Sequence, residues 1–573
     1  MKPDPATSKP PPRASPAPAE GGRMRLIERR IGLLFAGFLL CFLAIVGRAF
    51  WLQGVQGAQL SSQAISQQTE TIVVPGLRGS LLDRRGNKLA SSENAATIYA
   101  TPYQVKNAPQ AAAKLAPILD EKQGEVLEAL SEESGFSYLA RKVDLATAAR
   151  VKALQLEGVG ELPDSRRTYP QGEMAGQVIG AVGSENQGLI GLEAGEEPVL
   201  AGEDGERRIV NDALGEPIRT ETVKEAEDGE DVQLTLDPVI QQKTEQVLAG
   251  VGETYSPQGA TAIVVDPRSA QVLAMANWPP VDPADLSEVG NEDLMNRATG
   301  FNYEPGSTFK AFTVAAALEE GDVTPYSEFT LPPRLQVADR VIEDAEERGT
   351  ETMSVGQILA RSSNIGAVTI GLGLGATKFS KWIDRFGFGR PTGIRFPGEE
   401  DGIVPPLDEY SGSTMGNLPM GQGLAVTPMQ MVAGYTAIAD DGILRAPQLI
   451  KRIGEEEVRE PRGHRVISAK VATEVREMLE GVLAPGGTAS EVSVPGYSLA
   501  GKTGTAQVAE NGGYSETKYI ASFIGMAPAR HPQFLAAVIV DEPQGEIYGG
   551  SVAAPAFGQI AEFALPYLGV PQE

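Results

Sequence analysis

The chain has 573 residues, 42% of them apolar and 22% charged, with 49 basic residues against 75 acidic residues. This length predicts several domains with sizeable hydrophobic cores, and the formal net charge of -26 excludes the basic face that a nucleic-acid-binding protein requires. One cysteine, Cys41, and two histidines exclude an intrachain disulfide and a cysteine- or histidine-rich metal site. A carboxylate-only site for a hard cation stays open.

The first 53 residues combine a polar tail with an apolar segment. Residues 1–22 are rich in Pro, Ala and Ser and predict a disordered tail, which we extend through four arginines to position 30. The uncharged run Ile31–Gly47 then predicts a transmembrane helix over residues 31–53. No Lys or Arg occurs between Ala49 and Leu77, so the positive-inside rule predicts a single-pass protein of the plasma or inner membrane with a cytoplasmic N-terminus and an exported C-terminal part. A cleaved signal peptide is the alternative.

Residues 54–228 form a glycine-punctuated stretch without a catalytic cluster. A helical pattern covers 108–131, and no segment repeats at a fixed period. The charged run at 221–231 is typical of a solvated boundary. We therefore predict a non-catalytic domain over 54–228 and a second exported domain over 229–573.

The second domain begins with an amphipathic helical pattern at 239–248. Two short apolar runs after it predict a hairpin. Helical and strand-like patterns then follow in separate groups, which is typical of an α+β domain in which helices flank an antiparallel sheet. The expected hairpin strands are 260–265 and 271–276, the helices are 307–320, 354–374 and 426–441, and the later strands are 497–509, 518–527 and 534–541.

A Glu-Pro-Gly turn leads into the helical pattern that contains Ser307 and Lys310. At a helix N-terminus the free backbone N–H groups favour developing negative charge on a serine, and a side chain three residues later projects from the same face. A nucleophilic serine needs a base. His464 and His531 stand in loop-like settings typical of exposed surface, whereas burial beside a second cation can lower the pKa of a lysine enough for it to serve.

Two further motifs follow along the chain. Ser362 and Asn364, in the triplet Ser-Ser-Asn, offer a hydroxyl and a carboxamide, although this triplet alone is also typical of a helix cap or turn. The run Lys502-Thr503-Gly504-Thr505 falls in the strand-like segment 497–509. Its lysine and hydroxyls can hold a carboxylate, and its glycine either permits the close approach of another backbone or marks a bulge.

Ser-x-x-Lys, Ser-Asp-Asn and Lys-Thr-Gly together mark penicillin-binding proteins and class A β-lactamases, and here Ser363 stands where that set has Asp. The chain resembles the class B penicillin-binding proteins over residues 55–566. The sequence around Glu304 is similar to the division-specific branch, whereas the elongation branch tends to carry Pro at that position. The other segments that carry the resemblance are Arg78–Gly86, Arg167–Pro170, Gly188–Glu193, Lys518–Ala529, Asp541–Pro543 and Tyr548–Gly550.

The resemblance implies an elongated, mostly β pedestal of the dimerisation type at 54–228 and a serine β-lactamase-like transpeptidase domain at 229–573. It also implies a role for each motif residue in a serine acyl-enzyme mechanism. The implied roles are a nucleophile at Ser307, a general base at Lys310, a proton relay at Ser362, a peptide-binding amide at Asn364, a carboxylate site at Lys502, Thr503 and Thr505 with Gly504 between them, and an oxyanion hole from the N–H groups of Ser307 and Thr505.

The implied function is a D,D-transpeptidase that crosslinks peptidoglycan stem peptides during septal cell-wall synthesis. The resemblance implies inhibition by β-lactams, no metal or organic cofactor, and partners among divisome proteins, including a SEDS-family glycan polymerase. The alternatives are an elongation-type transpeptidase of the same family, a β-lactamase or carboxypeptidase that delivers water to the acyl-enzyme, and a catalytically silent penicillin sensor or divisome scaffold.

Overall fold

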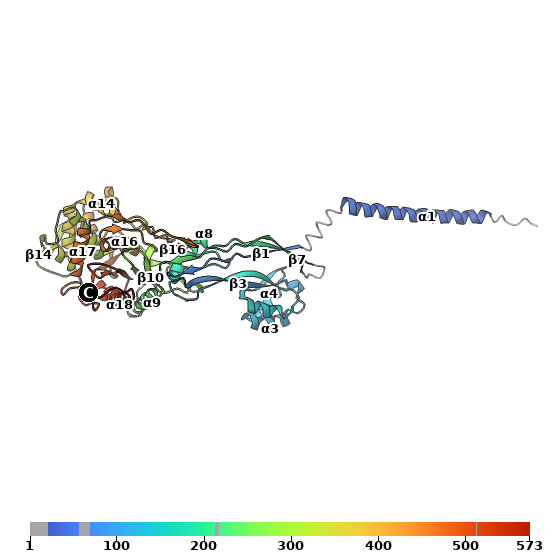
Figure 1. Ribbon diagram of the computed structural model, residues 1–573, viewed down its shortest axis with the longest axis horizontal. Helices are drawn as coiled ribbons and strands as arrows, with labels where there is room; N and C mark the ends of the chain where they lie inside the picture. The colour runs from blue at the N-terminus through green and yellow to red at the C-terminus, as the bar shows by residue number, and fades with distance from the viewer. Residues whose placement is uncertain (1–20, 57–68, 212–216, 511–512) are drawn as a thin grey trace, which may run out of the picture. The chain divides into compact units, whose positions relative to one another are not determined.

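The computed structural model describes residues 21–56, 69–211, 217–510 and 513–573. The chain falls into two units, a smaller one of Met1–Val73 with Glu206–Lys224 and a larger one of Val74–Gly205 with Glu225–Glu573 (Figure 1). Helices and strands occur together in both units. This confirms the predicted mixed α+β class.

The smaller unit contains one long helix and a small sheet. Helix α1 (Gly21–Phe50) continues into a π-helical turn (Trp51–Val55), and strands β1 (Thr69–Val74), β6 (Gly205–Asn211) and β7 (Pro217–Lys224) pair in the order β1-β6-β7. The charged run at 221–231 is mostly exposed, as expected of a solvated boundary, although its first four residues end β7.

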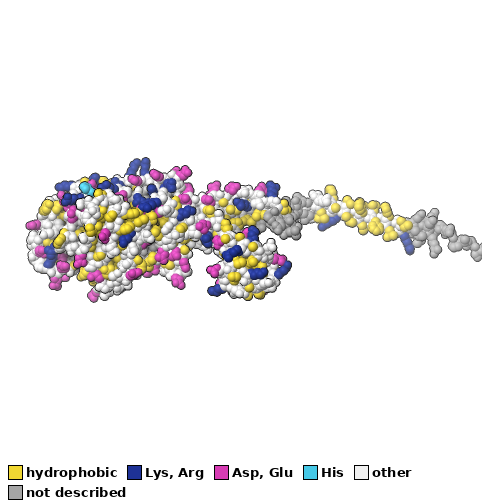
Figure 2. Space-filling view, turned by 60° about the horizontal axis from the view of Figure 1, so that its bottom comes forward, with side chains coloured by type: hydrophobic (Ala, Val, Ile, Leu, Met, Phe, Trp, Pro, Cys, Tyr) yellow, Lys and Arg dark blue, Asp and Glu magenta, His cyan; other side chains and the backbone are white. Residues whose placement is uncertain are grey.

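Helix α1 begins ten residues before the predicted membrane segment. Residues 21–30, which we expected in a disordered tail, are helical, because they are mostly good helix formers and include no proline; residues 1–20 lie outside the described residues. Among the residues with described positions, one helical stretch, Arg29–Val55, is long and apolar enough to cross a membrane. Hydrophobic side chains cover the face of this helix seen in Figure 2.

The N-terminal part of the larger unit has its own apolar cluster, formed where three helices pack on a hairpin-rich sheet (Figure 1). The single helical pattern predicted over 108–131 is two helices, because Asp120 adopts a left-handed conformation with φ 58° and ends the first one. The elements are β2 (Leu81–Leu82), β3 (Lys88–Ala100), α3 (Ala108–Leu119), α4 (Gln123–Leu130), β4 (Ser137–Asp144), α5 (Leu145–Lys152) and β5 (Val159–Thr168).

Three of the segments that carry the family resemblance meet in a buried ion cluster. Arg78 Nε lies 2.5 Å from Glu193 Oε2, and Arg167 Nε lies 2.7 Å from Glu193 Oε1. The Glu193 side chain is completely buried. Arg78 Nη2 donates to Glu193 O and Arg167 Nη1 donates to Gly79 O, and Arg78 Nη1 also pairs with Glu197 Oε2 at 2.6 Å. Three short helices flank this cluster, namely α6 (Gly176–Ile179), α7 (Gly191–Gly195) and α8 (Glu197–Leu200).

A mixed sheet joins this part to the C-terminal part of the larger unit. Its strands follow the order β17-β16-β8-β2-β3-β4, with β5 on β3, in the described part of the chain. Strand β8 pairs in parallel with β2 and antiparallel with β16. The additional strands are β8 (Val232–Leu234), β16 (Ile450–Ile453) and β17 (Glu456–Glu457).

A five-stranded antiparallel sheet forms the centre of the C-terminal part, in the order β10-β9-β21-β20-β19 among the described strands. The predicted strands are confirmed here, and β19 forms one edge. Strands β9 and β21 are buried along their whole length, which requires cover on both faces. The strands are β9 (Gly259–Val265), β10 (Val272–Trp278), β19 (Ala500–Glu510), β20 (Gly513–Ala527) and β21 (Phe534–Asp541).

Helices cover the two faces of this sheet. Phe557 of α18 lies against Gly525, whereas the 3₁₀ turn η3 lies against Gly504, the cross-strand partner of Ser522. Because residues 522 and 525 of one strand face opposite sides, α18 and η3 lie on opposite faces. Helix α9 packs beside α18, and α16 packs on β9, β20 and β21. These elements are α9 (Pro238–Tyr255), η3 (Gly306–Phe309), α11 (Lys310–Glu319), α16 (Pro428–Ala439) and α18 (Gly549–Tyr567).

The remaining elements surround this core. The helices are α10 (Arg297–Gly300), α12 (Val355–Ala360), α13 (Asn364–Leu374), α14 (Ala376–Arg385), α15 (Thr414–Asn417) and α17 (Ala469–Glu480), and the strands are β11 (Glu328–Leu331), β12 (Leu335–Val337), β13 (Arg340–Ile342), β14 (Glu351–Ser354), β15 (Ile443–Leu444) and β18 (His464–Arg465).

Candidate active site

Ser307 lies in the η3 turn, which runs directly into α11. Gly306 adopts φ 55°, a left-handed conformation that residues with a Cβ rarely adopt, and its N–H donates to Gly421 O at 3.0 Å. Ser307 is half-buried, and Lys310, the first residue of α11, is 1% exposed. The predicted helix start at Ser307 is therefore confirmed, with Lys310 one turn later.

Lys310 joins the first motif to the second. Its Nζ donates to Ser362 O at 2.6 Å and to Asn364 Oδ1 at 2.7 Å, and it lies 3.3 Å from Ser362 Oγ. Ser362 adopts φ 58° in the turn between α12 and α13. This left-handed conformation turns its carbonyl and its hydroxyl toward the same amine.

The helix predicted as continuous over 354–374 is wrong, because it breaks at residues 361–363. Ser363 Oγ accepts the N–H of Gly366 at 2.9 Å and thereby caps α13. A serine side chain competes in this way with the backbone bonds of a continuous helix. Both interpretations of the triplet hold together: Ser363 caps a helix while Ser362 and Asn364 face Lys310.

Strand β19 brings the third motif to the η3 turn (Gly306–Phe309), which contains Ser307. A Cβ at Gly504 would overlap Ser522 Oγ and would lie 3.0 Å from Thr308 Cγ2 and 3.1 Å from Pro305 O. The glycine therefore lets η3 pack directly on the strand, which is the close approach that the sequence analysis offered and not its alternative, a bulge, since Gly504 pairs regularly with Ser522. The three motifs thus meet at one place, although they are far apart in the sequence.

The polar side chains of β19 are held in place by neighbouring residues. Thr503 Oγ1 lies 2.6 Å from Thr488 Oγ1, and Thr505 Oγ1 accepts from Gly549 N–H at 3.0 Å, at the start of α18. Lys502 is fully buried, and its Nζ donates to Thr503 O at 3.1 Å. Two hydroxyls and an amine are therefore fixed along one edge strand.

Burial changes the ionisation of both lysines. Burial of Lys310, together with the positive charge of Arg348, lowers its pKa from its ordinary value of 10.5 to about 7. Burial, together with the charge of Lys310, holds the pKa of Lys502 well below its ordinary value. Lys310 is therefore available as a neutral amine near neutral pH, which is the form that accepts a proton.

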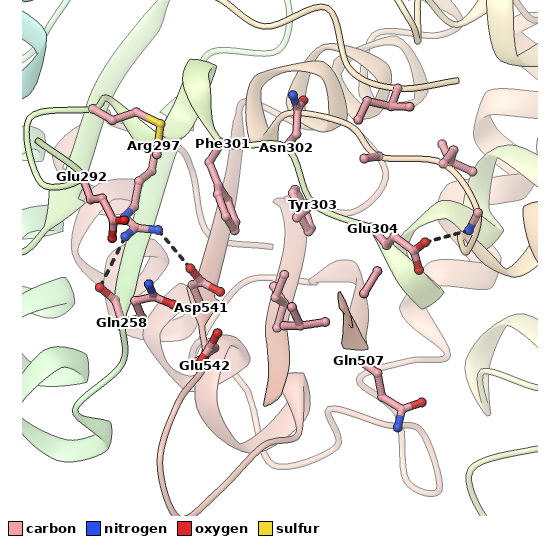
Figure 3. Close-up of a pocket in the computed structure, with 18 residues that line it drawn as sticks. Gln258, Glu292, Arg297, Phe301, Asn302, Tyr303, Glu304, Gln507, Asp541 and Glu542 are labelled. Atoms are coloured by element: carbon pink, nitrogen blue, oxygen red, sulfur yellow. Dashed lines mark hydrogen bonds and ion pairs between the residues drawn. The ribbon is translucent and has the colours of Figure 1, made fainter. Parts of the chain in front are cut away.

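A cavity of about 670 Å³ adjoins the motif residues without including them (Figure 3). It is bounded by Tyr303 and Glu304 just before the nucleophile turn and by Gln507–Ala509 at the end of β19. Four carboxylates and one arginine line it, and the arginine, Arg297, pairs with Asp541 at 3.0 Å. The cavity is thus acidic next to the turn that holds Ser307.

Glu304 connects the cavity to the turn. Its Oε1 accepts the N–H of Gly423 at 3.0 Å and the hydroxyl of Tyr514 at 3.2 Å, and burial raises the pKa of its carboxyl. Glu304 entered the sequence analysis only through the family resemblance, so its place at this cavity comes from the structure.

Two other residues at the site had no signal in the sequence. Asp344 and Arg348 both contact Ser363, yet they belong to a charged run that is typical of a solvated surface. The two histidines, by contrast, are exposed as predicted, although His464 lies in the short strand β18 and not in a loop.

Comparisons with known proteins agree with this geometry. The transpeptidase domain of penicillin-binding proteins matches residues 260–562, and the penicillin-binding protein dimerisation domain matches residues 73–234. Stage V sporulation protein D of Bacillus subtilis is 35% identical over 95% of this chain and 86% of its own length. Peptidoglycan D,D-transpeptidase FtsI of Escherichia coli is 32% identical over 93% of this chain and 91% of its own length.

A solved structure shows the same architecture. The crystal structure of penicillin-binding protein 3 from Mycobacterium tuberculosis, complexed with aztreonam, aligns with a TM-score of 0.69 and 30% identity over 87% of this chain and 98% of that chain. Together with the apolar helix α1 as a membrane anchor, these matches show that the chain belongs to the class B penicillin-binding proteins, the serine-type transpeptidases of cell-wall synthesis whose penicillin-binding domain takes peptidoglycan and β-lactams.

Proposed function

We propose that Ser307 is the nucleophile of this transpeptidase and that Lys310 is its general base. The observation that carries this proposal is the position of Lys310, buried one helical turn after Ser307 and with a pKa of about 7. A neutral amine there takes the hydroxyl proton as Ser307 attacks the carbonyl of the penultimate D-alanine of a stem peptide. The amide bond to the terminal D-alanine breaks, an ester to Ser307 forms, and the proton leaves with the amine of D-alanine.

The other motif residues bind the peptide and its leaving group in this proposal. Ser362 relays the proton from Lys310 to the departing amine, since its Oγ lies 3.3 Å from Lys310 Nζ. Asn364 binds the peptide backbone. Lys502, Thr503 and Thr505 hold the terminal carboxylate along β19, where Gly504 lets the nucleophile turn approach. The N–H groups of Ser307 and Thr505 form the oxyanion hole, at about 3 kcal/mol per donor.

The second half-reaction transfers the acyl group. An amine of a neighbouring stem peptide attacks the ester carbonyl, the new amide bond is the crosslink, and Ser307 leaves with the proton returned to its oxygen. A β-lactam acylates the same serine by opening its ring: the ring C–N bond breaks, the ring nitrogen takes the proton, and an ester to Ser307 forms. Because that nitrogen stays attached to the acyl group and does not depart, the ester persists and stalls the enzyme.

The nucleophile assignment is tested with a fluorescent penicillin on the purified full chain. Wild type and Ser131→Ala, an exposed serine in the α3–α4 region, should be labelled equally, whereas Ser307→Ala should not be labelled. Undiminished labelling of Ser307→Ala refutes the assignment. Rapid loss of the label from wild type indicates a hydrolase, and growth of cells that depend on Ser307→Ala indicates a scaffold.

We propose that the chain acts at the division septum. The support is the Tyr-Glu-Pro-Gly-Ser sequence around Glu304 and the match to FtsI. A fluorescent fusion should gather at midcell in dividing cells. An even distribution along the side wall indicates the elongation role instead.

We propose that the N-terminus is cytoplasmic and that residues 54–228 and 229–573 are exported as pedestal and transpeptidase domains. The support is the excess of arginine before the apolar run Ile31–Gly47 and the absence of Lys and Arg between Ala49 and Leu77. In a Cys41→Ser background, Ser131→Cys should react with a membrane-impermeant maleimide in intact cells whose outer layers are permeable to it, whereas Ser8→Cys should not. The reverse pattern contradicts the orientation.

We propose that the membrane helix and the pedestal bind a SEDS-family glycan polymerase and other divisome proteins. The support is an anchor attached to a large non-catalytic region. Purification of the full chain from membranes should recover such a polymerase, and replacement of residues 31–53 by an unrelated transmembrane helix should reduce the recovery. Recovery of no polymerase with wild type rejects the partner.

A further inference from the structure

The segment Glu343–Arg348 lies against the Ser-Ser-Asn turn and contacts Ser363, Asn364 and the following Ile365. It follows strand β13 directly and precedes β14. Three of its residues bind the turn, and none of them is among the motif residues.

Glu343 fixes the orientation of the Asn364 amide. The backbone oxygen of Glu343 accepts from Asn364 Nδ2 at 2.9 Å. A carboxamide has one acceptor oxygen and one donor nitrogen, so this bond turns Oδ1 toward Lys310 Nζ, which lies 2.7 Å away. Segment 343–348 therefore determines which end of the amide the base meets.

Asp344 and Arg348 hold Ser363, the serine between the two residues that face Lys310. Asp344 Oδ1 accepts the N–H of Ile365 at 3.1 Å, and Ser363 Oγ lies 3.1 Å from Asp344 Oδ2. An Arg348 guanidinium nitrogen donates to Ser363 Oγ at 2.8 Å and also pairs with Asp344. The side chains of Arg348 and Asp344 are 11% and 8% exposed, so the ion pair is largely desolvated. Its hydrogen bonds join charged groups, which makes them stronger than bonds between neutral groups.

We propose that Asp344 and Arg348 are positioning residues that lock the Ser-Ser-Asn turn so that Ser362 and Asn364 stay aligned on Lys310. They touch neither the nucleophile nor the base. They act through Ser363 and Ile365, whose neighbours in sequence make the contacts with Lys310. This inference rests on the proposed role of Lys310 as base.

The pair also sets the charge around Lys310. The charged groups that face this amine are Lys502 on β19 and Arg348, the latter compensated by Asp344 and, at 3.8 Å, by Glu351 on β14. Removal of Arg348 takes away a cation and raises the pKa of Lys310, whereas removal of the Asp344 charge leaves Arg348 less compensated and lowers it. The two changes therefore have opposite signs, although both break the same ion pair.

The experiment measures the rate of acylation by a fluorescent penicillin as a function of pH for full-length wild type, Arg348→Gln and Asp344→Asn. The plateau rate constant should fall about tenfold or more in both variants, because the turn is released, with little change in the penicillin concentration that gives half-saturation. The midpoint of the acid limb should move by up to about one pH unit, upward in Arg348→Gln and downward in Asp344→Asn. If the two substitutions merely destabilised the fold, the midpoints of both variants would move in the same direction.

Two further variants keep the result interpretable. Arg348→Lys keeps the cation and loses the forked geometry, so its midpoint should match wild type while its plateau stays reduced. Arg390→Gln, which breaks an exposed ion pair with Asp384 elsewhere in the unit, should match wild type in both measures. Wild-type plateau rates in Arg348→Gln and Asp344→Asn, or midpoints that move together, overturn the proposal. Full acylation of Lys310→Ala would instead contradict the proposed function.

Discussion

Two buried clusters of charge in the larger unit have opposite composition. Around Glu193, one carboxylate receives the guanidinium groups of Arg78 and Arg167, all of them almost completely buried. At the catalytic motifs, Lys310 and Lys502 are buried with no more than 1% exposure, and the nearby charges that act on them are positive.

The difference shows two uses of burial. In the Glu193 cluster each charge has an opposite partner and further hydrogen bonds, so the cluster ties three separated segments of the pedestal together. At the motifs, burial beside a like charge disfavours the protonated lysine, which suits its proposed role as a base. The first arrangement holds structure in place, and the second makes a side chain reactive.

The largest effect should come from removing the reactive amine. In Lys310→Ala, acylation by penicillin should fall roughly 10⁴-fold, because the variant loses the proposed base, the buried amine one turn after Ser307. The measurement is the acylation rate at pH 8, and unchanged thermal unfolding serves as the control. A loss of less than tenfold means that another group acts as base.

The next largest effect should come from unbalancing the paired cluster. Glu193→Gln leaves the buried Arg167 without a counter-charge and leaves Arg78 only the partly exposed Glu197, so the free energy of unfolding should fall by about 3–5 kcal/mol. Denaturant unfolding of the detergent-solubilised full chain measures this change. The fraction that remains folded should still be acylated at the wild-type rate; slower acylation would show that the cluster also shapes the active site.

The pH dependence of acylation should report Lys310. With a pKa of about 7, the neutral, active amine predominates above pH 7 and is lost as pH falls through 7. The acylation rate should therefore be about tenfold lower at pH 6 than on the plateau above pH 8. Tryptophan fluorescence at each pH checks that the protein stays folded. A rate that does not change between pH 6 and pH 8 contradicts the role of Lys310.

The smallest effect should come from the neighbour of Arg167. Arg166 makes an exposed ion pair with Glu93 at 3.4 Å, and such pairs contribute at most about 1 kcal/mol. Arg166→Ala should therefore unfold nearly as wild type does, while Arg167→Ala should lose several kcal/mol. Equal losses in the two variants would show that charge count, and not burial, determines the stability of the pedestal.

The sequence predicted those parts of the fold that depend on local pattern. The strand 534–541 and the helices after Ser307 and within 426–441 were predicted because their apolar residues are continuous or recur at a helical period. The break at Ser362 was not predicted, since it depends on the fit of one left-handed serine against Lys310.

The sequence predicted the motif residues of the site but not the residues that hold them in place. Ser307, Lys310, Ser362, Asn364 and the β19 residues follow a known order of motifs, and the structure brings them together. Asp344 and Arg348 could not be found in this way, because only tertiary packing turns part of an exposed-looking charged run into a desolvated pair.

The position of β19 at the edge of its sheet bears on drug resistance. An edge strand offers free backbone groups to an extended ligand, and in the proposed mechanism the same edge receives both the natural peptide and a β-lactam. A substitution that closes this edge would exclude both the β-lactam and the natural stem peptide.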